Sequence, residues 1–247
     1  MSFWLPVIAL WKRELVRFWR QKSRILGVVA SPLVFWLLIG SGFGDMGLFF
    51  PGSLVLTVMF SAIFSTITII EDRREGFLLS MLVSPASRTS LVLGKVFGSA
   101  TLAWIQGMIF LAFAPLAGVK AGAAGLLGAA ASIFLIAFTL AGLGFLIAWK
   151  MNSTQGFHAV MNLALLPMWM VSGAIFPVAK AQVWVKWVML ANPLTYSLAL
   201  LRGQLTPEAA AGSPPTQVSI ALTVLFGVVL LVASAKLANR KSTASAA

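Results

Sequence analysis

The chain of 247 residues contains no cysteine and a single histidine, His158. Without cysteine there is no disulfide bond and no thiolate to act as a nucleophile or metal ligand. One histidine leaves no cluster of side chains from which to build a metal site. His158 itself could relay protons, but a solitary histidine at a helix start is more often a polar surface residue. We therefore expect no metal site.

Motifs for nucleotide binding and hydrolysis are missing as well. No G-x-x-x-x-G-K-[ST] loop occurs, because Gly94-Lys95 is followed by Val96 and lacks the upstream glycine. Neither H-E-x-x-H nor G-x-S-x-G occurs. The sequence therefore predicts no catalytic, cofactor-binding or metal-binding residue, and we expect a protein that is not an enzyme.

Charged residues are scarce, at 10% of the chain, whereas 60% of the residues are hydrophobic and the mean hydropathy is +0.96. Soluble domains have about 25% charged residues. The net charge of +12 could attract nucleic acid, but the basic residues flank apolar runs rather than gather on a soluble domain. This pattern is typical of a protein embedded in membrane lipid, with no nucleic-acid partner.

Apolar runs of about 20 residues predict an all-α, polytopic membrane protein whose residues 1–247 form one transmembrane domain. Gly94 and Gly98 have the spacing of small residues that allows close contact between helices. The six acidic residues all fall near the ends of the apolar runs, which disfavours a proton-driven transporter. We expect six membrane-spanning helices, over residues 25–43, 51–70, 91–116, 126–149, 157–176 and 218–235.

Two further segments are expected to lie in the membrane interface. Residues 2–24 predict an amphipathic helix, with apolar residues on one face and arginines directed toward lipid phosphate on the other. A signal peptide is the alternative, but the basic region is too long and no A-x-A site follows it. Residues 177–203 predict one or two short re-entrant helices in the outer interface, anchored by Trp184 and Trp187.

The basic residues also predict the orientation of the chain. Four of the 18 lie in predicted outer segments, namely Lys120, Lys180, Lys186 and Arg202, and the other 14 lie on the opposite side. Because cytoplasmic loops carry an excess of lysine and arginine, we expect both ends of the chain in the cytoplasm.

The segment between the second and third predicted spans, Glu71–Lys95, begins with five consecutive charges, which cannot lie in hydrocarbon. Gly76 follows, then an apolar stretch that ends at Ser84-Pro85. This pattern predicts a short cytoplasmic helix suited to a groove on a partner. Two alternatives remain: the helix rests on the bilayer, or the charges form ion pairs within a solvated helix end. The exposed apolar face is expected to consist of Phe77, Leu78, Met81 and Leu82.

Three passages resemble the permease subunits of type-2 ATP-binding-cassette (ABC) exporters, a class that includes drug, polysaccharide and lipo-oligosaccharide exporters. They are Pro32…Gly40-x-Gly42-x-Gly44, then Glu71-Asp-Arg-Arg-Glu75-Gly76…Leu82-Val-Ser-Pro85…Arg88…Gly94-Lys95, and Asn192-Pro193-Leu-Thr-Tyr196…Leu201-Arg202-Gly203. One departure is Ala199, which stands where many relatives have an acidic residue.

The resemblance implies that the segment after the second span is a coupling helix that binds a separate ATPase. Its coupling residues would be Glu71, Arg73, Arg74, Glu75, Gly76, Phe77, Leu78, Met81, Leu82, Pro85 and Arg88. The outer re-entrant motif would be Asn192, Pro193, Tyr196 and Arg202, with substrate contact and interface anchoring both open for the last two.

The resemblance also implies an assembly and an activity. Two ATPase subunits would hold ATP and Mg²⁺, and a second copy of the permease, or a related permease, would complete the path through a bacterial-type cytoplasmic membrane. The apolar, nearly charge-free helices favour a hydrophobic or amphipathic substrate, such as a drug-like, lipid or lipid-linked molecule, exported from the cytoplasm or inner leaflet. An ion-coupled secondary transporter and a membrane scaffold without transport activity are the alternatives.

Overall fold

The computed structural model describes residues 3–20, 22–210 and 212–239, and the side chains of these except for residues 22–29. Every regular element within the described ranges is helical, which confirms the predicted all-α class. The long or medium helices are α1 (Trp4–Trp19), α2 (Lys22–Phe43), α3 (Met46–Ser65), α4 (Thr68–Arg74), α5 (Phe77–Val83), α6 (Arg88–Leu111), α7 (Ala123–Lys150), α8 (Thr154–Trp169), α9 (Val183–Ala191), α10 (Pro193–Leu205) and α11 (Thr216–Asn239). Short 3₁₀ or π segments are η1 (Ala114–Ala117), η2 (Met170–Ala174), η3 (Val178–Lys180) and η4 (Pro207–Ala210).

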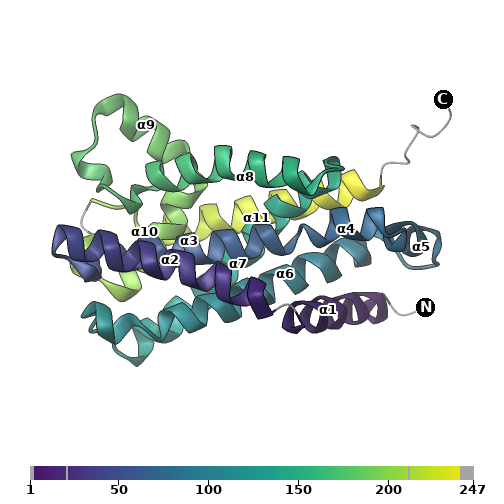
Figure 1. Cartoon of the computed structure of the whole chain (residues 1–247). Helices are drawn as coiled ribbons and strands as arrows, with labels where there is room; N and C mark the ends of the chain where they lie inside the picture. Colours follow the sequence, from purple (N-terminus) through teal and green to yellow (C-terminus); the bar gives the residue numbers. More distant parts are fainter. Residues whose placement is uncertain (1–2, 21, 211, 240–247) are drawn as a thin grey trace.

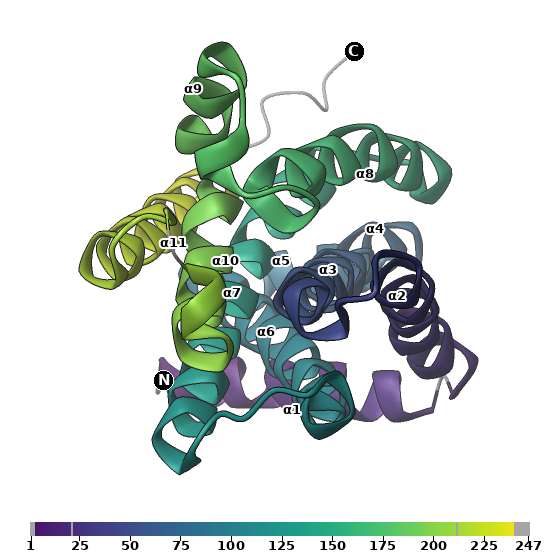
Figure 2. The same cartoon turned by 90° about the vertical axis from the view of Figure 1, so that its left-hand side faces the viewer.

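The long helices lie side by side in one bundle (Figure 1). One end of the bundle, which we call the α5 end, carries α1, α4, α5 and the last turns of α11. The opposite end, the α9 end, carries α9 and the turns that join the long helices there. Figure 2 views the bundle along its length and shows α1, in purple, lying across it. A helix in this orientation is compatible with the predicted position in a membrane interface.

Among the described residues, five helices are long and apolar enough to cross a membrane. They lie where the second to sixth spans were predicted, and they are Met46–Arg74, Arg88–Leu111, Ala123–Lys150, Thr154–Ala174 and Thr216–Asn239. The first predicted span, residues 25–43, falls on α2. The structure does not describe the side chains of the first five residues of this predicted span. The apolar part of α2 that it does describe is Ala30–Phe43. The count of six spans therefore stays a prediction.

Helix α3 begins at Met46 rather than at the predicted Pro51. The carboxylate of Asp45 caps the helix by accepting a hydrogen bond from the Leu48 amide at 2.9 Å. Gly44, with φ of +70°, makes the turn from α2 in a conformation that favours glycine. The predicted outer turn is thus shorter than expected, because Asp45 ends it by capping the next helix.

Helix α3 is the centre of the bundle, because residues on all of its sides are buried. It packs on α2, α6, α7 and α10. Trp36 of α2, Phe50 of α3 and Phe110 of α6 form an aromatic cluster with ring centroids between 5.2 and 6.1 Å apart. The indole N–H of Trp36 donates to the Met46 carbonyl at 2.9 Å, so the polar atom of this buried ring is satisfied.

Candidate functional site

The helix predicted between the second and third spans is present as α5, at the α5 end of the bundle (Figure 1). Gly76 separates it from α4 and has φ of +75°, in the left-handed region that favours glycine. After the helix, Ser84 is extended with ψ of 157°, as is usual for the residue before a proline. The predicted position of the helix, between Gly76 and Ser84-Pro85, is therefore explained by local backbone conformation.

The side chains of α5 are distributed differently from the predicted exposed face. Leu78 and Met81 are buried, with exposed fractions of 6% and 8%. They pack in an apolar cluster with Leu10 of α1 and Leu91 of α6. The expectation that these two residues are exposed is therefore wrong, because this face of α5 packs against α1 and α6.

The exposed apolar residues of α5 lie on the opposite face. Leu79 has an exposed fraction of 66% and Val83 of 77%, and the prediction named neither of them. Pro85 beside them is exposed, whereas Phe77 and Leu82 are partly buried against the apolar cluster. A partner that binds α5 from outside the bundle would meet Leu79 and Val83 first.

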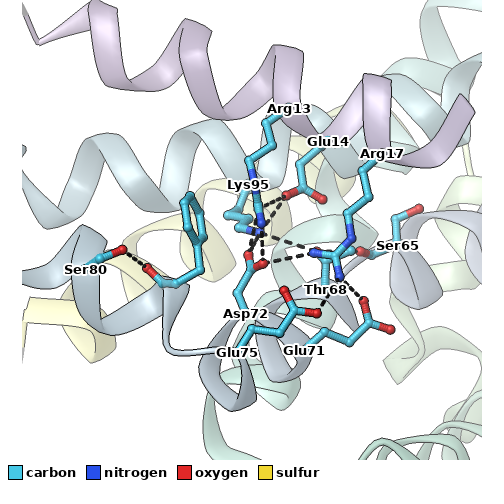
Figure 3. Close-up of polar contacts among 11 residues, drawn as sticks. Arg13, Glu14, Arg17, Ser65, Thr68, Glu71, Asp72, Glu75, Ser80 and Lys95 are labelled. Atoms are coloured by element: carbon cyan, nitrogen blue, oxygen red, sulfur yellow. Dashed lines mark hydrogen bonds and ion pairs between the residues drawn. The ribbon is translucent and has the colours of Figure 1, made fainter. Parts of the chain in front are cut away.

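The charges that precede α5 form contacts between helices, not ion pairs within a solvated helix end (Figure 3). At the centre is Asp72 of α4, which is fully buried. Arg13 of α1 donates two hydrogen bonds to its carboxylate, of 3.1 and 2.8 Å, and Arg17 donates one of 2.9 Å. The Lys95 ammonium of α6 donates to the same carboxylate. Asp72 thus holds three helices together at one point.

A second buried carboxylate completes this arrangement. Lys95 Nζ donates to Oε1 of Glu14 at 2.6 Å, and the exposed fractions of Lys95 and Glu14 are only 4% and 2%. At the solvent side of the arrangement, Arg17 pairs with Glu71 at 2.8 Å and with Glu75 at 3.5 Å. Buried charges persist only when they are paired and hydrogen-bonded, and here each one is. We call these seven residues the charge cluster: Arg13, Glu14, Arg17, Glu71, Asp72, Glu75 and Lys95.

Glycine allows α1 to approach α6 closely enough for these contacts. A Cβ atom added at Gly98 would lie 2.8 Å from Cβ of Glu14, and one at Gly94 would lie 2.8 Å from Cβ of Leu10. Both separations are shorter than real Cβ atoms tolerate, so only glycine fits without displacement of α1. The predicted use of these two glycines for close helix contact agrees with this geometry, and the helix in contact with them is α1.

Arg13 connects the charge cluster to the start of α5. Its guanidinium carbon lies 3.7 Å from the centre of the Phe77 ring, within the range of a cation–π contact. Burial alone lowers the pKa of Arg13, but hydrogen bonds to Asp72 and the charges of the neighbouring carboxylates outweigh it and raise the pKa. Arg13 therefore remains a cation, placed between Asp72 and the aromatic ring.

The remaining predicted arginines attach α4 and α6 to neighbouring helix ends. Arg73 donates to the carbonyls of Trp149 and Met151, at 2.6 and 2.7 Å, where α7 ends. Arg74 donates to the Asn152 carbonyl at 3.2 Å. Arg88 donates to the Ala238 carbonyl in the last turn of α11 at 3.0 Å. Cations at helix C-termini satisfy free carbonyls and oppose the helix dipole, so these arginines stabilise the fold around α5.

The predicted outer motif forms a joint between helices at the α9 end. Asn192 caps α10 by accepting a hydrogen bond from the Leu194 amide at 3.0 Å, and its amide group donates to the Met168 carbonyl of α8 at 2.5 Å. Pro193 follows at the first position of α10, where its missing N–H costs nothing. The Tyr196 hydroxyl donates to the Leu190 carbonyl of α9 at 2.7 Å. These contacts join α8, α9 and α10.

Arg202 is buried in the same joint. It donates to the Gly173 carbonyl at 2.7 Å, where the backbone of η2 departs from helical geometry with φ of +98°. Burial lowers the pKa of Arg202 to about 10. Tyr196 and Arg202 thus each donate to a backbone carbonyl inside the chain, and the choice between substrate contact and interface anchoring stays a prediction.

Three residues at the centre of the charge cluster were not among the predicted site residues: Glu14, Asp72 and Lys95. The arginines of residues 2–24 were predicted to face lipid phosphate, but Arg13 and Arg17 bind carboxylates instead. The side chain of Arg24 is not among those that the structure describes. A signal was present in the sequence, because the arginine-rich residues 2–24 carry an excess of positive charge, and three of the six acidic residues of the chain lie together at Glu71, Asp72 and Glu75.

The fold and these sites define a multi-pass helical membrane protein in which buried ion pairs join α1, α4 and α6 next to the short helix α5. The model of the ABC-2 type transporter family matches residues 6–205. The chain belongs to this family, and it is a membrane transport subunit without enzymatic activity of its own.

Individual relatives agree with the family match. The "Putative transport permease ycf38" of Cyanophora paradoxa is 25% identical over 210 residues, covering 79% of this chain and 72% of that protein. Nodulation protein J of Rhizobium leguminosarum bv. viciae is 26% identical over 250 residues, covering 95% and 94%. Linearmycin resistance permease protein LnrN of Bacillus subtilis (strain 168) is 30% identical over 128 residues, covering 51% of this chain and 33% of that protein.

Proposed function

We propose that the chain is the membrane-spanning permease subunit of an ABC exporter, driven by ATP hydrolysis on a separate ATPase. The observation that carries this proposal is the exposed face of α5, where Leu79 and Val83 project from a short helix outside the spans. Large apolar side chains that are exposed together on such a helix mark a surface for contact with a partner protein or with the membrane. In this family the expected partner is a separate ATPase with a groove on its surface. Helix α5 would bind in that groove and would therefore be the coupling helix.

In the proposed assembly, two permease chains and two ATPase subunits form the transporter. ATP and Mg²⁺ bind to the ATPase subunits, and closure of the ATPase pair tilts the permeases through their coupling helices. All six predicted spans would cross a bacterial-type cytoplasmic membrane, with both ends of each chain in the cytoplasm. The exposed apolar faces of α8 and α11 leave area for lipid and for a second permease copy.

The proposed substrate is hydrophobic or amphipathic and enters from the membrane or its inner leaflet. An open groove of about 620 Å³ between α1 and the turn from α5 to α6 supports this, because apolar side chains line most of it. Phe3, Leu5 and Pro6 line one side and Met81, Pro85 and Leu91 the other. The name of the Bacillus subtilis relative, a linearmycin resistance permease, fits removal of a compound from the cell.

The proposal is tested by co-expression with the partner ATPase, followed by co-purification and transport assays in liposomes. Exchange of both exposed residues, Leu79→Ser with Val83→Ser, should release the ATPase and stop ATP-dependent transport. Val183→Ser, at an equally exposed position on α9, is the matched control and should change neither. Transport by the isolated chain, driven by an ion gradient, would support a secondary transporter instead. ATPase binding without movement of any amphiphile would support the scaffold.

A further inference from the structure

Three charged side chains of the charge cluster are almost completely buried. Glu14, Asp72 and Lys95 come from α1, α4 and α6, and each has an exposed fraction of 4% or less. In Figure 3 their charged groups converge at one point between these three helices. Any sliding of one helix past another would separate at least one buried charge from its partner, which is costly. The junction therefore has one favoured register.

Helix α5 contacts two of these helices on its buried face. Leu78 and Met81 pack on Leu10 of α1 and Leu91 of α6, while Arg13 of the cluster lies against the Phe77 ring. Apolar contacts alone permit small sliding motions at little cost, since they have no direction. Ion pairs with hydrogen bonds are directional, so the charge cluster supplies the register that the apolar contacts of α5 lack.

We propose that Asp72, Glu14 and Lys95 are positioning residues for transport. Their ion pairs clamp α1 and the adjacent part of α6 to α4 and to the coupling helix α5 that follows it. These elements then move as one body. This inference rests on the proposed function of α5 as the coupling helix. A force that the ATPase exerts on the exposed face of α5 is then transmitted to a membrane span through α6. It also reaches the membrane surface through α1, whose Trp4, Leu5 and Trp19 are exposed.

The first test compares Asp72→Asn with Asp72→Glu in the full complex with the ATPase, reconstituted in liposomes. Asp72→Asn has the same size but no charge, and it leaves the exposed face of α5 in place. It should retain ATPase binding and ATP hydrolysis while transport per ATP falls about tenfold, within the range that coupling between sites produces. Asp72→Glu keeps the carboxylate and should recover a large part of the coupling. A purely structural role would instead lower binding, hydrolysis and transport in parallel.

A second variant preserves the charge balance in case Asp72→Asn reduces folding. Glu14→Gln combined with Lys95→Gln removes one anion and one cation and leaves the contacts between Arg13 and Asp72 intact. It should show the same loss of transport per ATP. A wild-type ratio of transport to hydrolysis in either folded variant would overturn the clamp and leave the proposed function standing. Failure of the wild-type chain to bind or use an ATPase would overturn the proposed function itself.

Discussion

The ammonium nitrogen of Lys95 lies 2.6 Å from a carboxylate oxygen of Glu14, with both side chains buried between α6 and α1. The same ammonium also contacts Asp72, so one cation serves two buried anions from different helices. Removal of a single partner from such a pair leaves an uncompensated buried charge, which costs far more than loss of a surface ion pair.

Lys95→Met should therefore destabilise the chain. Glu14 would keep only Arg13 at 3.5 Å, and we expect the free energy of unfolding to fall by about 3–5 kcal/mol. Thermal unfolding in detergent micelles measures this effect. Lys120→Met, at an exposed lysine of the α9 end, is the matched control and should change stability by less than about 0.5 kcal/mol. Equal melting temperatures for the two variants would contradict the assignment of a buried ion pair.

Gly98→Ala should displace α1 from α6. The added Cβ would lie 2.8 Å from Cβ and 2.9 Å from Cγ of Glu14, and overpacking of this kind costs about 1–3 kcal/mol. Gly42→Ala in α2 is the control, because a Cβ there meets nothing within 4 Å. It should be neutral or slightly stabilising, since alanine favours a helix more than glycine does. Only Gly98→Ala should lower the melting temperature; an unchanged melting temperature for Gly98→Ala would show that the contact between α1 and Gly98 is looser than described.

The two faces of α5 should respond differently to truncation. Leu78→Ala removes a buried side chain and should destabilise the isolated permease by about 2–5 kcal/mol. Leu79→Ala removes an exposed one and should leave unfolding unchanged while it weakens ATPase binding, by about 1–2 kcal/mol if it is an interface anchor. Pull-down and thermal unfolding, measured on both variants, separate the roles. Weaker binding from Leu78→Ala alone would favour the buried face as the docking surface.

Much of the fold follows from sequence patterns because the membrane imposes simple rules. Apolar runs of fixed length indicate helices, and Gly76 and Ser84-Pro85 indicate where α5 begins and ends. The joint at Asn192 is similarly local, because an asparagine before a proline is typical of a capped helix start. The bounds of α3 were less well predicted, since Asp45 could be interpreted as a turn residue or as a cap.

The orientation of α5 could not be predicted, because it depends on a contact distant in sequence. Leu78 and Leu79 are adjacent and chemically identical, and the packing of α5 against α1 and α6 decides which one is buried. The charge cluster depends on the same contact. Arg13 and Asp72 each suggest a surface position when considered alone, and their pairing appears only when glycines on α6 admit α1. Both misjudged features therefore have one physical cause.

The proposed orientation predicts on which side of the membrane each end of the bundle lies. Ser80→Cys on the exposed face of α5 and Ala209→Cys in η4 introduce single thiols into a chain without cysteine. A membrane-impermeant maleimide added to intact cells should label Ala209→Cys and leave Ser80→Cys unlabelled until the membrane is opened. Tags at both chain ends should likewise report the cytoplasm. Labelling of Ser80→Cys in intact cells would reverse the orientation, and labelling of neither would contradict six spans.

The joint at the α9 end should depend on both polar groups of Asn192. Asn192→Ser keeps an oxygen that can cap α10 but loses the amide that donates to the Met168 carbonyl, whereas Asn192→Ala loses both contacts. A buried carbonyl without its donor costs about 1–3 kcal/mol, and loss of a helix cap costs about 0.5–2 kcal/mol more. Stability in micelles should thus fall stepwise from wild type to Asn192→Ser and then to Asn192→Ala. If Asn192→Ser unfolds like the wild type, the bridge to α8 contributes nothing, and the cap alone explains the asparagine.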